Sequence, residues 1–377
     1  NWWEGSLEAV PQSVRLANIT AEVKAFNPKG LKISDKWGDA TFSFDLTADV
    51  KGRSLRTVDG SVNISQFMMD DGDSSFAFDN MLLLASAKDG RQRLSVESDF
   101  ANVEVEGQYD YKTLLQSITN TIGSRLPTLP GLPKTTTGNV RNDFTLSADI
   151  SNSDFIRHFF DIPLTLHEPI VINGELDDYD QLLQLHATLP HFTYDEKEYR
   201  GGLLDITTQD DTLRTHANIQ RIGEGNNRLT LELDAAAADN HLGTSLLFDS
   251  QTRQSIRGQL NADAQFFKTD DNNDAAHVDI HSSEIVVGDS IWTVEPGTIV
   301  YSKNNVTIDH LAVKHGAQHI FIDGHATTLP SDTLIAELKD VDVKYILDLV
   351  NFHSVDFSGK ATGKAVLTQA FQKPEAS

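Results

Sequence analysis

The chain has 377 residues and a formal net charge of −24, from 55 acidic against 31 basic side chains. This acidic balance argues against nucleic acid as a partner and against docking on anionic lipid headgroups. Cysteine is absent, which excludes thiol catalysis, disulfide bridges and cysteine-ligated zinc, and no stretch approaches the roughly 18 apolar residues needed to span a bilayer.

Residues 1–109 are predicted to form a first series of strands. Apolar and polar residues alternate from Phe42 through Phe44 and Leu46 to Val50, which is the period of a strand with one apolar and one polar face. Dipeptides typical of tight turns follow at Lys51-Gly52, Asp59-Gly60, Asp71-Gly72 and Asp89-Gly90. Their spacing predicts an antiparallel meander of hairpins.

The period changes to that of a helix in the segment 110–134. Asp110 is expected to cap this helix and Pro127 to end it. One face of the helix carries the apolar residues Leu115, Ile118, Ile122 and Leu126. We expect this face to plug or cover the apolar side of the sheet. The Pro- and Gly-rich stretch that follows is expected to be a crossing segment.

Residues 135–377 are predicted to form a second strand series, with short helices near 154–160 and 343–350. Alternating runs recur throughout this part of the chain. The apolar members of the alternating runs in both series are expected to share one face of the sheet and to line a hydrophobic groove. These candidate lining residues are Phe42, Phe44, Leu46, Leu229, Leu231, Leu233, Val306, Ile308, Ile320, Ile322, Leu334, Leu338, Val355 and Phe357.

Together these patterns predict a mostly β chain in one continuous unit. We expect an elongated, curled antiparallel sheet with an apolar inner face and a few short helices. An open apolar trough is disfavoured in water by about 25 cal/mol per Å². Phospholipid acyl chains are expected to fill it, with headgroups projecting into water along the open seam.

Thirteen histidines raise the question of a metal site. His277 and His281 would stand about 13 Å apart on a strand, too far for one ion. The acidic loop 270–274 begins like a calcium loop but lacks the glycine and glutamate that such a loop requires. In the group His310, His315, His319 and His325, His315 and His319 flank an expected turn at Gly316 and could converge, but no third ligand is evident for them.

Motifs for catalysis are also missing from the sequence. It contains no G-x-S-x-G elbow, no H-E-x-x-H zinc helix and no phosphate loop. A lipid conduit needs no catalytic group, because the cargo slides along a surface of nearly uniform affinity. We therefore predict that the chain is not an enzyme and has no catalytic residue, metal or cofactor.

Two stretches resemble the repeated strand-rich region of the TamB family, within the AsmA-like superfamily, in its Bacteroidetes-type version. They are 'EGQYDYKTLLQSITNTIGSRLPTLPGL' and 'NNVTIDHLAVKHGAQHIFIDGHATTLPSDTLIAELKDVDVKYILDLVNF', the latter continued by 'HSVDFSGKATGKAVL'. The resemblance implies a periplasmic, taco-like sheet that serves outer-membrane biogenesis. Its implied roles are phospholipid transfer between membranes and assembly of outer-membrane or secreted proteins.

The resemblance also implies partners that this segment does not contact by itself. In the family, an inner-membrane anchor and a module that meets an Omp85-type outer-membrane barrel both belong to regions outside such a segment. The motifs of the family are structural, so no catalytic residue is transferred to this chain.

Two other classes of function remain open on the sequence. In a β-sandwich binding module or adhesin, the apolar faces would pack against each other and the loops would carry the function. A carbohydrate-active or other β-rich enzyme would need a cleft in which carboxylates converge beside Tyr or Trp. The aromatic residues are 19 Phe against 7 Tyr and 4 Trp, a balance that favours an apolar lining.

Overall fold

The computed structural model describes residues 3–6, 15–52, 57–133, 141–223, 225, 227–251, 255–329, 331–343, 359–368, 371 and 375–376. In these residues the chain forms strands β1–β25, the helices α1 and α2, and the turns between them. Each strand pairing between them is antiparallel, which confirms the predicted mostly β, antiparallel fold. The predicted helix near 343–350 lies outside the described residues, apart from Val343.

The chain divides into two compact units. The first contains residues 1–118 and 137–205, and the second contains residues 119–136 and 206–377. The chain therefore passes between the units inside α1 (Leu114–Arg125), at residue 136, and inside β12 (Lys197–Gln209). The segment boundaries at residues 109 and 134 remain predictions from the sequence.

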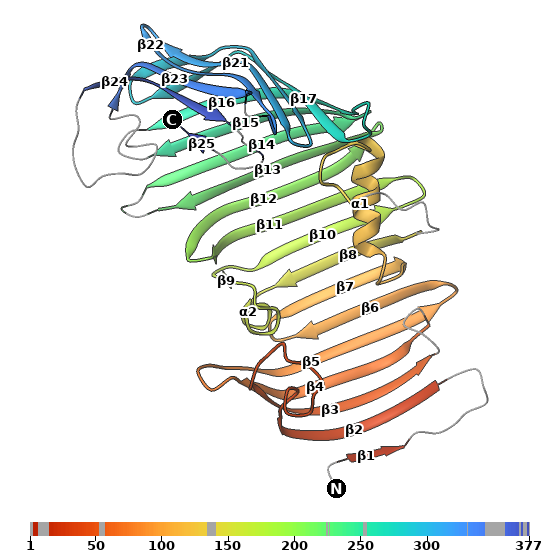
Figure 1. Cartoon of the computed structure of the whole chain (residues 1–377). Helices are drawn as coiled ribbons and strands as arrows, with labels where there is room; N and C mark the ends of the chain where they lie inside the picture. Colours follow the sequence, from red (N-terminus) through yellow and green to blue (C-terminus); the bar gives the residue numbers. More distant parts are fainter. Residues whose placement is uncertain are drawn as a thin grey trace. The chain divides into compact units, whose positions relative to one another are not determined.

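In the first unit the strands pair in chain order from β1 to β8. β10 pairs with β8, β11 pairs with β10, and the short β9 pairs with the far part of β11. Figure 1 shows these strands in red to light green. Their bounds are β1 (Trp3–Ser6), β2 (Arg15–Phe26), β3 (Thr41–Gly52), β4 (Asp59–Asp70), β5 (Ser75–Lys88), β6 (Arg91–Ser98), β7 (Ala101–Gln108), β8 (Asp143–Ile150), β9 (Leu164–Leu166), β10 (Ile170–Asp177) and β11 (Leu182–Tyr194).

In the second unit β16 pairs with β17 over one part and with β18 over the other, and β21 pairs with β20 and β19 in the same way. The pairs β17–β20 and β18–β19 therefore lie end to end between β16 and β21. The bounds are β13 (Thr212–Ile222), β14 (Arg228–Ala238), β15 (His241–Gln251), β16 (Ile256–Lys268), β17 (Asp274–Ile280), β18 (Ser283–Val287), β19 (Ser290–Val294), β20 (Gly297–Ser302), β21 (Asn305–His315), β22 (Gln318–Ala326), β23 (Thr333–Asp342), β24 (Lys360–Thr368) and β25 (Glu375–Ala376).

Two-residue turns with positive φ at both positions join several hairpins. This conformation suits the right-handed twist of the strands on either side. The turn predicted at Asp89-Gly90 has it, with φ of 52° and 82°. Three further turns adopt this conformation without glycine and were not predicted. Most of their residues are Asp or Asn, which tolerate a positive φ better than most residues. The three turns are Asp195-Glu196, Asp210-Asp211 and Asp239-Asn240.

α1 begins later than the sequence predicts. It runs from Leu114 to Arg125, whereas the predicted N-cap was Asp110. The Asp110 carboxylate instead accepts a hydrogen bond from the Lys112 N–H at 3.0 Å and forms a turn before the helix. The Ser117 N–H then donates to the Thr113 carbonyl at 3.0 Å. Asp110 therefore belongs to the turn before α1 and does not cap the helix.

α2 (Asp154–Phe160) confirms the predicted helix near 154–160. Ser153 occupies the N-cap position, but its hydroxyl accepts a hydrogen bond from the Leu166 N–H at 3.0 Å and does not cap the helix. The Asn152 side-chain oxygen accepts the N–H of the first helical residue instead, at 2.8 Å. The helix ends at Asp161, whose left-handed φ of 58° turns the chain away.

Candidate functional site

One face of the sheet in the second unit is apolar across successive strands. Residues directly opposite each other in antiparallel strands point to the same face. Leu231 lies opposite Ile219 on β13 and Phe248 on β15, and Ile322 lies opposite Leu311 on β21. Rows of this kind continue from β13 to β24. The alternation along each strand thus becomes a continuous apolar surface.

The structure places the predicted lining residues of this unit on that face. They are Leu229, Leu231, Leu233, Val306, Ile308, Ile320, Ile322, Leu334 and Leu338. All of them are half-buried, so their side chains pack against neighbours and still meet solvent. Val355 and Phe357 lie outside the described residues. A row of half-buried aliphatic side chains is an apolar surface that its own chain covers only in part.

The first unit has an apolar face of the same kind. Leu46 lies opposite Ala21 on β2 and Ile64 on β4, and Leu83 lies opposite Val96 on β6. Leu46 and its row neighbours are half-buried. The middle of these strands therefore resembles the apolar face of the second unit in its partial exposure.

A packed aromatic cluster covers one end of the face in the first unit. Its buried rings belong to Phe42, Phe67, Phe76, Phe78 and Phe100. Phe67 and Phe78 stack with centroids 4.6 Å apart and planes at 7°. Phe42, predicted to line the groove, is a member of this cluster, whereas Phe44 beside it is only half-buried. Phe76 and Phe78 were not among the predicted lining residues. They alternate with polar or small residues, and this alternation could have predicted that both rings lie on the same face.

α2 covers this aromatic cluster. Phe155 stacks on Phe100 at 5.0 Å between centroids, and Phe159 lies 4.9 Å from the ring of Trp37. The Trp37 indole N–H donates to the Phe159 carbonyl at 3.2 Å, which fastens the loop after β2 to the helix. At this end of the sheet the apolar face is therefore shielded by the protein itself.

The first turn of α1 is held to the first unit by a buried polar network. Asn142 donates from Nδ2 to the hydroxyls of Ser117 at 2.6 Å and Thr113 at 3.1 Å, and its Oδ1 accepts the Asp110 N–H at 2.8 Å. The Asp178 carboxylate accepts hydrogen bonds from the Ser117 hydroxyl and the Asn142 N–H, both at 2.7 Å. These contacts fix the helix start beside the ends of β8 and β10 (Figure 1).

The predicted plug residues of α1 differ in burial. Leu126 is buried, Ile118 and Ile122 are half-buried, and the side chain of Leu115 lies outside the described part of the chain. The most buried residues within the helix are polar, namely Ser117, Thr121 and Arg125. Ser117 is satisfied by Asp178 and Asn142, whereas the Arg125 guanidinium donates within the helix, to the Thr121 carbonyl at 3.4 Å and the Ser124 hydroxyl at 2.6 Å. This buried face is polar, so the apolar pattern of the helix does not predict it.

Pairs of histidine and carboxylate occupy the polar face of the second unit. Five of the histidines considered above each contact a different acid, and the sixth, His315, donates from Nδ1 to the Ile291 carbonyl at 2.7 Å, so they do not surround one point. The pairs include His277 with Asp279 at 3.1 Å, His281 with Asp263 at 2.8 Å and His310 with Glu295 at 2.7 Å. In the acidic loop Lys268 forms an ion pair with Asp274.

A solvent-open depression of about 430 Å³ lies where β17 ends and β20 begins. The carboxylates of Asp279 and Asp309 and the imidazoles of His281 and His310 line it. The Thr298 hydroxyl donates to Asp279 at 3.0 Å and holds the pKa of this carboxyl below its ordinary value. No Tyr or Trp is among the lining residues, so the depression lacks the aromatic platform that a sugar site would need.

Glu295 on the same face gives a pH-dependent prediction. Hydrogen bonds from Lys314 at 2.6 Å and then from His310 at 2.7 Å hold its pKa below the ordinary 4.5. A lowered folded pKa adds stability above the unfolded pKa, and this stability is lost as pH falls through the folded value. Glu295→Gln should therefore lower the Tm near pH 6 and change it less near pH 3. Glu284→Gln, at the exposed position of β18, is the control. A pH-independent difference for Glu295→Gln would contradict the assignment.

No family model, curated protein or solved structure matches this chain. Among the residues that the structure describes, no helix is long and apolar enough to cross a membrane. Function must therefore be inferred from the two faces of the sheet.

Proposed function

We propose that the chain is a periplasmic segment of a TamB-like envelope-biogenesis protein, and that its apolar face carries phospholipid acyl chains between membranes. The observation that carries the proposal is the continuous, half-buried apolar face of the second unit. Such a face has apolar area left to bury, and each Å² that a ligand covers contributes about 25 cal/mol.

Acyl chains suit this surface better than a ligand of fixed shape. Hydrophobic contact is not directional, so a row of Leu, Ile and Val side chains offers similar affinity at each step. A lipid tail can then move along the rows without a catalytic group. The opposite face carries Glu232, Asp234 and Asp263 among other charged residues, which keeps the sheet in water while its apolar face holds the cargo.

The same face offers a second cargo of related chemistry. A strand of an unfolded outer-membrane or secreted protein also presents a row of apolar side chains. The resemblance to the TamB family adds the partners to the proposal. An inner-membrane anchor and an Omp85-type barrel would be contacted through regions outside this segment.

Placing a carboxylate on the apolar face tests the proposal. We expect Leu231→Glu to abolish binding of a fluorescent phospholipid, because the charge would meet acyl chains. Leu231 is half-buried, so the carboxylate can reach water and the Tm should fall only modestly. The same change at Ile308 and Ile322 should have the same effect. The measurement is lipid binding together with thermal unfolding, preceded by native mass spectrometry for phospholipid that co-purifies with the wild type.

Leu247→Glu is the matched control for these variants. Leu247 is 41% exposed and lies opposite Glu232 and Gln259, on the polar face of β15. This variant should bind lipid like the wild type. If each of the three substitutions on the apolar face unfolds the chain, the face is the sealed core of a sandwich, and the proposed lipid conduit is wrong. Undiminished lipid binding by stable variants would remove these residues from the lipid path.

A further inference from the structure

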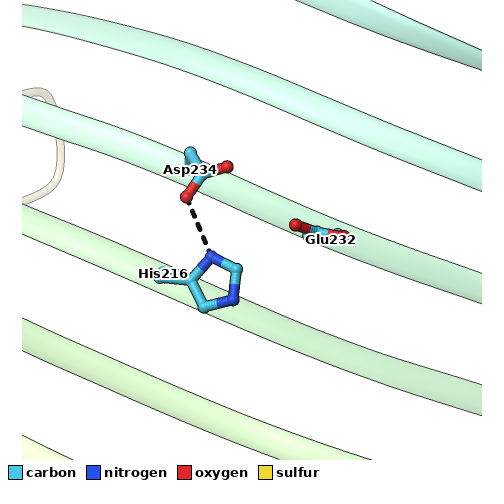
Figure 2. A group of neighbouring side chains, drawn as sticks. All are labelled: His216, Glu232 and Asp234. Atoms are coloured by element: carbon cyan, nitrogen blue, oxygen red, sulfur yellow. Dashed lines mark hydrogen bonds and ion pairs between the residues drawn. The ribbon is translucent and has the colours of Figure 1, made fainter.

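Four side chains that can coordinate a metal form a compact patch on the polar face of β13 and β14. His216 lies directly opposite Asp234, and Asn218 lies directly opposite Glu232. Residues two apart on a strand share a face, so these four side chains form a two-by-two group. Figure 2 shows His216 and Asp234 facing each other across the two strands, with Glu232 beside them.

The atoms of this patch are close enough to share an ion. One ligand atom from each of His216, Glu232 and Asp234 lies within 4.8 Å of the others. His216 Nδ1 and Asp234 Oδ1 are 2.8 Å apart, as the dashed line in Figure 2 marks. Bonds of about 2.0–2.1 Å from zinc place its ligand atoms about 3.3 Å apart. Small side-chain rotations would therefore bring all three groups to coordinating distance.

Asn218 provides an independent observation. Its side-chain Oδ1 is buried and accepts no hydrogen bond from any described residue. Buried acceptors are almost always satisfied by a donor, and a cation serves the same purpose. Because Asn218 is the cross-strand neighbour of Glu232, its unpaired oxygen belongs to the same patch as the three ligands.

We propose that His216, Glu232 and Asp234 form a binding site for a divalent transition-metal ion such as Zn²⁺, with Asn218 or water completing the coordination. One imidazole with two carboxylates is a donor set that zinc accepts. The ion would tie β13 to β14 and offset the repulsion between the two carboxylates on β14. The site lies on the face opposite to Leu231, so it is separate from the proposed lipid surface and does not depend on it.

The chain contains a natural control for this site. His186 on β11 contacts Asp205 through the same pair of atom types, Nδ1 and Oδ1, at 2.5 Å. Among the described residues no third metal-ligating group gathers at that pair. Replacing His186 with Ala therefore tests whether a single imidazole–carboxylate pair is enough to bind the metal.

The experiment is a titration of the metal-stripped chain with ZnCl₂, followed by calorimetry and by thermal unfolding. We expect one saturable site, an affinity at least about tenfold lower in His216→Ala and Glu232→Gln, and wild-type binding in His186→Ala. Zinc should raise the Tm of the wild type and of His186→Ala, and not of the other two variants.

Glu232→Gln keeps the shape of the side chain, so its circular dichroism should match that of the wild type and its loss of binding would report coordination. The absence of saturable zinc uptake by the wild type would overturn the proposal. Equal zinc affinity in the wild type, His216→Ala and Glu232→Gln would overturn it as well.

Discussion

Replacing Phe67 with Ala is expected to cost about 3–5 kcal/mol of the free energy of unfolding of the first unit. Phe67 is buried, stacks on Phe78 at 4.6 Å, and lies 6.1 Å from both Phe42 and Phe76. Truncation removes these contacts and leaves a cavity that α2 cannot fill, because Phe155 already packs on Phe78 and Phe100. A domain is typically stable by about 5–15 kcal/mol, so this loss is a large part of the total.

Urea unfolding followed by circular dichroism measures this effect, with Met68→Ala as the control. Met68 is the next residue on β4, points to the other face and is 45% exposed. Its truncation should change the free energy of unfolding by no more than about 0.5 kcal/mol. Similar small losses for both variants would show that the aromatic rings do not form a packed cluster.

Replacing Asn142 with Ala is expected to cost about 3 kcal/mol or more of the free energy of unfolding. Asn142 is 1% exposed and serves three hydrogen bonds, which involve Asp110, Thr113 and Ser117. Each buried polar group that loses its partner costs about 1–3 kcal/mol. Without these hydrogen bonds the first turn of α1 also loses its attachment to Asn142, so the backbone amides of residues 114–118 should exchange faster with solvent.

Hydrogen exchange and urea unfolding together check this prediction. Asn102→Ala is the control, because Asn102 is an exposed residue of β7 on the polar side of the same sheet. It should leave both the free energy of unfolding and the exchange of α1 unchanged. If Asn142→Ala behaves like Asn102→Ala, the polar network does not hold the helix, and apolar contacts must do so instead.

The sequence by itself determined which residues share a face. Alternation along a strand is fixed by the backbone, since successive side chains point to opposite sides whatever the strand pairs with. Leu229, Leu231 and Leu233 could therefore be assigned to one apolar face before any pairing was known. The turn at Asp89-Gly90 and α2 were predictable for the same reason, because turn residues and helical periodicity act over a few neighbouring positions.

Only the tertiary structure decided what lies opposite each residue and what covers each face. His216 meets Asp234 because of the register between β13 and β14, and a slip of one residue would have separated them. Asn142 meets Ser117 at the start of α1, although 25 residues separate the two along the chain. Contacts of this kind depend on how several elements are placed relative to one another, and no periodic pattern within one segment encodes that placement. The apolar rows were therefore predictable, whereas the polar network and the metal patch were not.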